Sequence, residues 1–158
     1  MLPGKARILT CPHCGSKKEV LSLRSGNTFD ARYWSDGKTE APMMPPVSFI
    51  QKCPECGKYF LMSRQEEEYG ENFSSELGNL SYDEMKEALQ ELLNDSCSLN
   101  EQFGLIMEYI HSFNDKYLRK GKVDIPETER QLFSRYTNQI VHLEGAWGDT
   151  PNSQLLKA

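Results

Sequence analysis

The amino-acid sequence predicts an α+β protein, in which a small antiparallel β unit around a metal site precedes an antiparallel bundle of about three α-helices. Two Cys-x-x-Cys pairs and several short stretches of alternating apolar residues lie in the first part of the chain. The rest repeats its apolar residues at helical spacing. We therefore expect a metal-binding domain over residues 1–62, a polar linker over 63–80 and an acidic helical domain over 81–158.

Strands are expected where apolar residues alternate in the first domain. Residues 28–34 would place Phe29 and Tyr33 on one face of a strand. Further short strands are expected over residues 19–23, 47–52 and 58–62. The sequence SDGK at residues 35–38 is a tight-turn signal, but the proline-rich residues that follow make a poor strand. We expect this turn to join a strand to a loop.

Helix starts are marked by capping boxes in the second half of the chain. Ser81 with Glu84 and Ser98 with Glu101 each have the Ser-x-x-Glu spacing that satisfies free amides at a helix N-terminus. A third helix is expected to begin near Pro126, since proline is favoured in the first turn. Residues 150–156 look like the start of a further helix; either the chain ends before this helix gains its apolar face, or its two leucines pack on a partner.

The four cysteines at metal-ligand spacing lie in the pentapeptides CPHCG and CPECG; they are Cys11, Cys14, Cys53 and Cys56. A Cys-x-x-Cys turn lets two thiolates reach one ion at about 2.3 Å, and two such turns complete a tetrahedron. Four soft thiolates favour one zinc ion per chain, or iron where iron is acquired. Because no coordination position is left for water, we expect a structural rather than a catalytic metal.

These paired pentapeptides resemble the knuckles of the zinc-ribbon and rubredoxin-like group. The resemblance covers about the first 60 residues, and it implies that each knuckle lies on a β-hairpin and that the four cysteines hold zinc. The 38 residues between Cys14 and Cys53 exceed the roughly 15–20 of the short-insert form. The wider layout, a ribbon before an acidic helical segment, also resembles uncharacterised bacterial proteins, which implies no activity.

Other interpretations of the cysteines and histidines have less support. Disulfides are disfavoured because the chain start has no apolar signal segment, which also makes the cytoplasm the expected compartment. His13 is expected to be an exposed turn residue rather than a ligand. A catalytic pair of His111 and His142 has no supporting motif. Cys97 is expected to be a small packed residue rather than a nucleophile.

The insert between the knuckles, residues 15–52, carries interleaved aromatic and basic residues. Such a pattern can bind single-stranded nucleic acid by stacking and phosphate contact. It is also typical of a small metal domain, in which aromatic residues on strands supply the scarce core. A third interpretation is a ligand site on the surface, with Trp34, Asp36 and Lys38 at its lip.

The distribution of charge and the motifs of the sequence disfavour several classes of function. Residues 1–62 carry nine Lys and Arg against five Asp and Glu, whereas residues 63–158 carry nine against 18. The acidic half disfavours a nucleic-acid partner. No run of apolar residues approaches the length of a membrane span, and no phosphate-binding loop or nucleophile motif occurs. We expect a non-enzymatic protein-interaction module that binds a protein partner or itself; nucleic-acid binding, and then a redox or other enzyme, are the alternatives.

Overall fold

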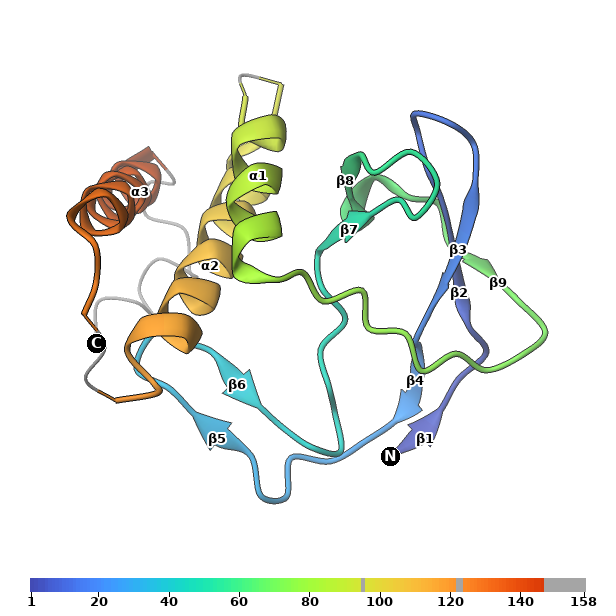
Figure 1. Ribbon diagram of the computed structural model, residues 1–158. Coiled ribbons are helices and arrows are strands. Elements are labelled where there is room, and N and C mark those ends of the chain that lie inside the picture. Colours follow the sequence, from blue (N-terminus) through green and yellow to red (C-terminus); the bar gives the residue numbers. More distant parts are fainter. Residues whose placement is uncertain (95, 122–123, 147–158) are drawn as a thin grey trace. The chain divides into compact units, whose positions relative to one another are not determined.

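The computed structural model describes residues 1–94, 96–121 and 124–146, and within them the protein is a mixed α+β chain (Figure 1). Short antiparallel strands come first and three α-helices follow. The chain divides into two compact units, Met1–Leu92 and Leu93–Ala158. In the described part of the chain, no helix is both long enough and apolar enough to cross a membrane.

The first unit contains a three-stranded sheet. Strand β2 (Arg7–Thr10) lies in its centre and pairs antiparallel with β3 (Lys17–Val20) on one side and β9 (Glu68–Tyr69) on the other. Strand β1 (Leu2–Pro3) pairs with β4 (Leu23–Ser25) beyond it. The first Cys-x-x-Cys pair forms the turn between β2 and β3, so it lies on a β-hairpin, as the resemblance to zinc-ribbon knuckles implies.

A second hairpin carries the other cysteine pair. Strand β7 (Ile50–Lys52) pairs antiparallel with β8 (Tyr59–Leu61), and a short 3-10 helix (Met62–Arg64) follows. All three residues of β8 are buried. The expected strands over 47–52 and 58–62 are thus confirmed, although each is shorter than the apolar pattern suggests.

The expectation that the SDGK turn leads into a loop is wrong. Strand β5 (Arg32–Tyr33) pairs with β6 (Thr39–Glu40) across this turn, so it joins strand to strand. Gly37 adopts φ +82, and the Gly37 amide donates to the Trp34 carbonyl at 3.0 Å. Strand β6 consists of only two residues, which lie before Pro42 and are not proline. Their backbone amide and carbonyl groups are enough to pair with β5 and close the hairpin.

The segment that the sequence predicts as a linker, residues 63–80, lies within the first unit and is hydrogen-bonded to other parts of it at several points. Besides β9, it accepts a hydrogen bond at 2.7 Å from the Leu21 amide to the Glu76 carbonyl. Gly78 has φ +66 and lies against the fully buried Gln51 side chain. These contacts are non-local, so the polar composition of the segment does not reveal them.

Helix α1 (Tyr82–Leu92) belongs to the first unit and packs beside β8. Ser81 and Glu84 form the expected capping box: the Glu84 amide donates to Ser81 Oγ at 3.4 Å and the Ser81 amide donates to Glu84 Oε2 at 3.0 Å. Met85 and Leu89 are buried, as the apolar spacing predicts. A bundle of three helices stays a prediction, because the contacts of α1 that define its unit are with the strands.

The second unit contains α2 (Leu99–Tyr117) and α3 (Glu127–Ala146), which pack on one another. Ser98 caps α2 with the expected box to Glu101. Aromatic rings fill the contact, with Phe113 stacked on Phe133 at 4.2 Å between ring centroids and Tyr109 edge-on to Tyr136 at 5.2 Å. The further helix expected over residues 150–156 lies outside the described residues.

Candidate metal centre

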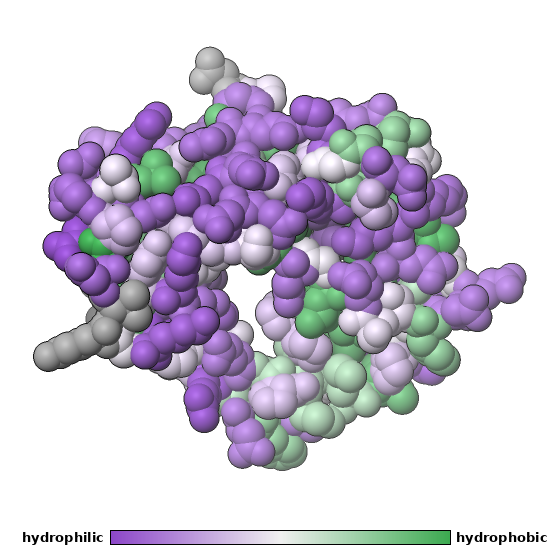
Figure 2. All heavy atoms as spheres, viewed as in Figure 1, coloured by the Kyte–Doolittle hydropathy of each residue, from purple (hydrophilic) through white to green (hydrophobic). Residues whose placement is uncertain are grey.

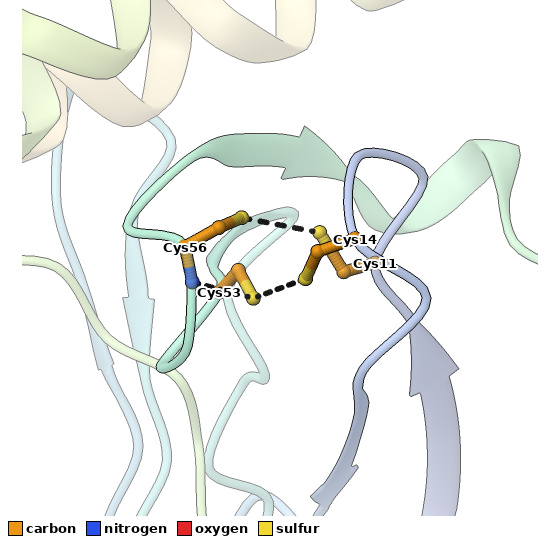
Figure 3. Close-up of side chains that lie close together, drawn as sticks. All are labelled: Cys11, Cys14, Cys53 and Cys56. Carbon is orange, nitrogen blue, oxygen red and sulfur yellow. Dashed lines mark hydrogen bonds between the residues drawn. The ribbon is translucent and has the colours of Figure 1, made fainter.

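The two hairpins bring the four predicted ligands together (Figure 3). Their sulfur atoms all lie within 4.8 Å of one another. Cys11 Sγ faces Cys56 Sγ at 3.6 Å, and Cys14 Sγ faces Cys53 Sγ at 3.6 Å, so each short distance joins the two knuckles. Each cysteine is free of disulfides.

These sulfur–sulfur distances fit the tetrahedral coordination of one ion. Four thiolates at the usual zinc–sulfur distance of about 2.3 Å are about 3.8 Å from one another. The two cross-knuckle distances of 3.6 Å are close to that value. All four donors are cysteine sulfurs, which suit a soft or borderline metal. The four cysteines are therefore positioned to bind a metal ion.

The first knuckle is shaped by its own backbone hydrogen bonds. The Gly15 amide donates to the Cys11 carbonyl at 2.9 Å, and the Cys11 amide donates to the Ser16 carbonyl at 2.8 Å. Gly15 has φ +75, a left-handed conformation that residues with a Cβ rarely adopt. The turn therefore closes on itself and holds both cysteines on the same side.

The second knuckle repeats this geometry. The Gly57 amide donates to the Cys53 carbonyl at 3.0 Å, the Cys53 amide donates to the Lys58 carbonyl at 2.9 Å, and Gly57 has φ +71. In addition, the Cys56 amide lies 3.5 Å from Cys53 Sγ and points its hydrogen at that sulfur. The near-identity of CPHCG and CPECG thus gives two turns of matching backbone.

The four ligands are buried unequally. Cys11 and Cys53, the first cysteine of each knuckle, are 3% and 2% exposed and belong to a core cluster with Leu9, Val20 and Phe60. Cys14 and Cys56 are exposed. Each knuckle therefore contributes one sulfur from the core and one from the solvent side, and an ion held by all four would tie the surface turns to the core.

Hydrogen bonds set the acidities of the metal-free thiols apart. The Cys56 amide, followed by the Ser16 hydroxyl, lowers the pKa of Cys53 to about 6. The Ser16 hydroxyl is also the main cause that lowers the pKa of Cys14. The largest single effect on the pKa of Cys56 is the hydrogen bond from the Lys58 amide, which lowers this pKa. Desolvation and the neighbouring thiols together outweigh that hydrogen bond and raise the pKa of Cys56 to about 12. Metal binding would release the protons that remain on these sulfurs.

Ser16 is a residue near the site that the motif alone does not single out. Its hydroxyl oxygen lies 3.0 Å from Cys53 Sγ and 3.2 Å from Cys14 Sγ. The available signal in the sequence is a hydroxyl residue directly after the knuckle glycine. That signal is weak, because the contact with Cys53 spans 37 residues and depends on how the hairpins meet.

A row of polar contacts links helix α1 to the second knuckle and its strands. Lys52 Nζ lies 2.8 Å from Glu84 Oε1, the Tyr59 hydroxyl donates to Glu87 at 2.9 Å, and Lys58 lies 3.6 Å from Glu91. The three acidic residues are 84, 87 and 91, so they share one helix face. The Lys52 ammonium, followed by the Ser81 amide, lowers the pKa of Glu84 to about 2. The helix is thereby fixed to the strands that flank Cys53.

The candidate surface residues Trp34, Asp36 and Lys38 all lie in the β5–β6 hairpin. The Trp34 amide donates to the Lys38 carbonyl at 2.9 Å, and the Lys38 amide donates to the Asp36 carboxylate at 3.2 Å. Lys38 Nζ also lies 3.1 Å from Glu40. These contacts stabilise the turn, and the ligand site suggested for this lip stays a prediction.

Comparison of the chain with known protein families, with curated proteins and with solved structures found no match.

Proposed function

We propose that this chain is a non-enzymatic protein-interaction module whose first unit is held together by one structural zinc ion in a zinc-ribbon-like site. The observation that supports the metal part is the closed set of four sulfurs, all within 4.8 Å of one another. Structural zinc sites use four protein ligands, whereas catalytic sites keep a position for water. Four thiolates also favour zinc over harder ions.

The zinc ion would serve as a cross-link between the two hairpins. Cys11 and Cys53 hold it from the core, and Cys14 and Cys56 close the site from the solvent side. The strands they join are three or four residues long, which is short for independent stability. Binding free energy at such a site is folding free energy, so the metal would fix the surface that the first unit presents.

Exposed apolar side chains on the first unit support the interaction part of the proposal. Phe29 and Tyr33 are 76% and 70% exposed, although both are large aromatic residues. Met43 and Met44 are also exposed, and on the face shown in Figure 2 apolar side chains gather around β1 and β4. Aromatic residues and methionine are enriched where proteins bind one another.

The metal part is tested by elemental analysis of the purified full chain. We expect one zinc per chain and a colourless protein. Iron at one per chain, with the visible absorption of an iron–thiolate site, would replace the structural proposal by an electron-transfer one. Absence of any stoichiometric metal after purification and zinc addition would remove the metal part altogether.

The interaction part is tested with a double variant, Phe29→Ser with Tyr33→Ser. We expect the variant to keep the zinc content and the circular dichroism spectrum of the wild type. It should lose either the self-association that sedimentation detects for the wild type or the ability to capture a protein partner that the wild type binds. Phe73→Ser is the matched control, because Phe73 is 68% exposed in the same unit but lies outside the insert. Equal behaviour of wild type and double variant would count against this surface, and a wild type that neither self-associates nor captures a protein would refute the interaction proposal.

Nucleic-acid binding is the second candidate, and the exposed Arg32 beside Tyr33 is the observation that favours it. Arginine next to an aromatic ring can contact phosphate while the ring stacks on a base. The residues after 62 carry a formal excess of nine negative charges, which opposes it. A salt titration with a single-stranded oligonucleotide tests this second candidate. If the protein contacts phosphates, its affinity for the oligonucleotide must fall as the ionic strength rises.

A further inference from the structure

The two knuckles match in backbone but differ at the residue that follows the glycine. This residue is Ser16 in the first knuckle and Lys58 in the second, and each accepts the amide hydrogen bond of its own first cysteine. The Lys58 ammonium lies 3.6 Å from Glu91, on helix α1. The Ser16 hydroxyl instead lies between two ligand sulfurs, 3.0 Å from Cys53 and 3.2 Å from Cys14.

The position of Ser16 is fixed independently of its hydroxyl. Its carbonyl accepts the Cys11 amide at 2.8 Å, which holds the backbone at the end of the knuckle. Strand β3 begins at the next residue, Lys17, and pairs with β2. The serine side chain is half-buried. A hydroxyl in this place needs little further ordering to reach Cys53, which belongs to the other hairpin.

Metal binding determines which of these groups donates. A metal-bound cysteine is a thiolate and can only accept hydrogen bonds, whereas a serine hydroxyl carries one hydrogen. Cys14, which can donate to Ser16 as a thiol, loses that hydrogen when it binds metal. The Ser16 hydrogen then has two thiolates within reach, and Cys53 is the nearer.

We propose that Ser16 is a positioning residue of the metal site, which donates a hydrogen bond across the knuckles to the Cys53 thiolate and so strengthens metal binding. This rests on the proposed function only in so far as the four cysteines bind a metal. Four thiolates around a dication leave an excess of negative charge, which a nearby donor stabilises. Partners of this kind typically contribute 10–100-fold to metal affinity.

The test is metal affinity of the full chain, measured with Zn²⁺ by competition against a chromophoric chelator and with Co²⁺ by its thiolate charge-transfer absorption. We expect Ser16→Ala to weaken binding of both ions by about tenfold or more. Ser16→Thr, which keeps the hydroxyl, should restore most of the affinity. Lys58→Ala is the matched control at the equivalent position, and its affinity should stay within about twofold of the wild type because its ammonium is not at the sulfurs.

A spectroscopic readout separates this role from a general loss of structure. A hydrogen bond lowers the energy of the sulfur electrons, so its removal should move the charge-transfer band of Co²⁺-loaded Ser16→Ala to longer wavelength. The Lys58→Ala band should not move. An unchanged band and affinity in Ser16→Ala, with wild type binding metal, would overturn the proposal. A wild type that binds neither ion would instead refute the metal site itself.

Discussion

In the first unit, a cluster of buried side chains contains two of the four candidate metal ligands, whereas the second unit is packed by aromatic rings between two helices. Cys11 and Cys53 are buried with Leu9, Val20 and Phe60 in the first. Tyr109 and Phe113 of α2 meet Phe133 and Tyr136 of α3 in the second. We infer that the first unit depends on an ion for stability, because its strands are short and its core is small. In the described part of the second unit, we infer that the packing of apolar and aromatic side chains supplies most of the stability.

Loss of the metal should have the largest effect, and only in the first unit. We expect Cys53→Ser, or chelation of the wild type, to remove the ion and unfold the strands, since a structural zinc supplies on the order of 10–16 kcal/mol in small domains. Helices α2 and α3 should keep their hydrogen-exchange protection. Cys97→Ser is the control, because Cys97 is buried but is not a member of the cluster.

Metal content and hydrogen exchange by mass spectrometry, resolved by peptide, check this outcome. Wild-type metal content in Cys53→Ser would refute the assignment of the ligands. Equal loss of protection in both units would show that the ion stabilises the whole chain, and the contrast between the units would fail.

Truncation of the aromatic contact should have the converse effect. Phe113 is 2% exposed and stacks on Phe133, so Phe113→Ala removes a buried ring and leaves a cavity. We expect a loss of about 3–5 kcal/mol in the second unit. Zinc content and strand protection should not change. Val141→Ala, on a side chain that is 64% exposed, provides the control with little expected loss. Release of metal from Phe113→Ala would contradict the inferred independence of the two cores.

A smaller effect is expected where residues 63–80 meet the first unit. Gly78→Ala would put a methyl group 1.9 Å from Gln51 Oε1, at a residue with φ +66. We expect a loss of about 2–4 kcal/mol, from left-handed strain together with overpacking. Gly37→Ala is the matched control, since Gly37 has φ +82 but no atom within 4 Å of the added carbon. It should lose only about 1–2 kcal/mol.

The difference between these two alanine variants in thermal or denaturant unfolding measures the contact with Gln51. Equal losses of stability in the two variants would mean that the contact between residues 63–80 and Gln51 does not stabilise the protein. These residues would then behave as the linker that their composition suggests.

The smallest effect is expected for the ion pair between α1 and β7. Glu84→Gln keeps an oxygen for the Ser81 cap but removes the charge that pairs with Lys52 at 2.8 Å. Because both side chains are about one-third exposed, we expect a loss below about 1 kcal/mol. Asp83→Asn is the control, since Asp83 is 74% exposed and its ion pair with Lys86 lies within the helix.

The pH dependence of this pair has a defined sign. The folded pKa of Glu84 is lowered to about 2 from an ordinary value of 4.5. Stability from the pair is therefore fully present above about pH 4.5 and is lost as the pH falls toward 2. The difference between wild type and Glu84→Gln should be constant from pH 7 to about 4.5. A difference that changes already above pH 5.5 would contradict the assignment of this pH dependence to Glu84.

The sequence by itself determines the features that depend on residues a few positions apart. Two Cys-x-x-Cys turns with a following glycine specify the four candidate ligands, because the reach of each pair is set within one turn. The boxes Ser81–Glu84 and Ser98–Glu101 specify where α1 and α2 begin, because their hydrogen bonds span three residues.

Only the tertiary structure decides which distant groups meet. It pairs Cys11 with Cys56 and Cys14 with Cys53, places the Ser16 hydroxyl on a sulfur of the other hairpin, and adds β9 to β2. It also assigns α1 to the strands through Glu84 and Glu87. Such contacts join residues 28 to 62 positions apart. Their formation depends on the packing of both hairpins and on the cost of closing the loops between them, neither of which a local pattern contains.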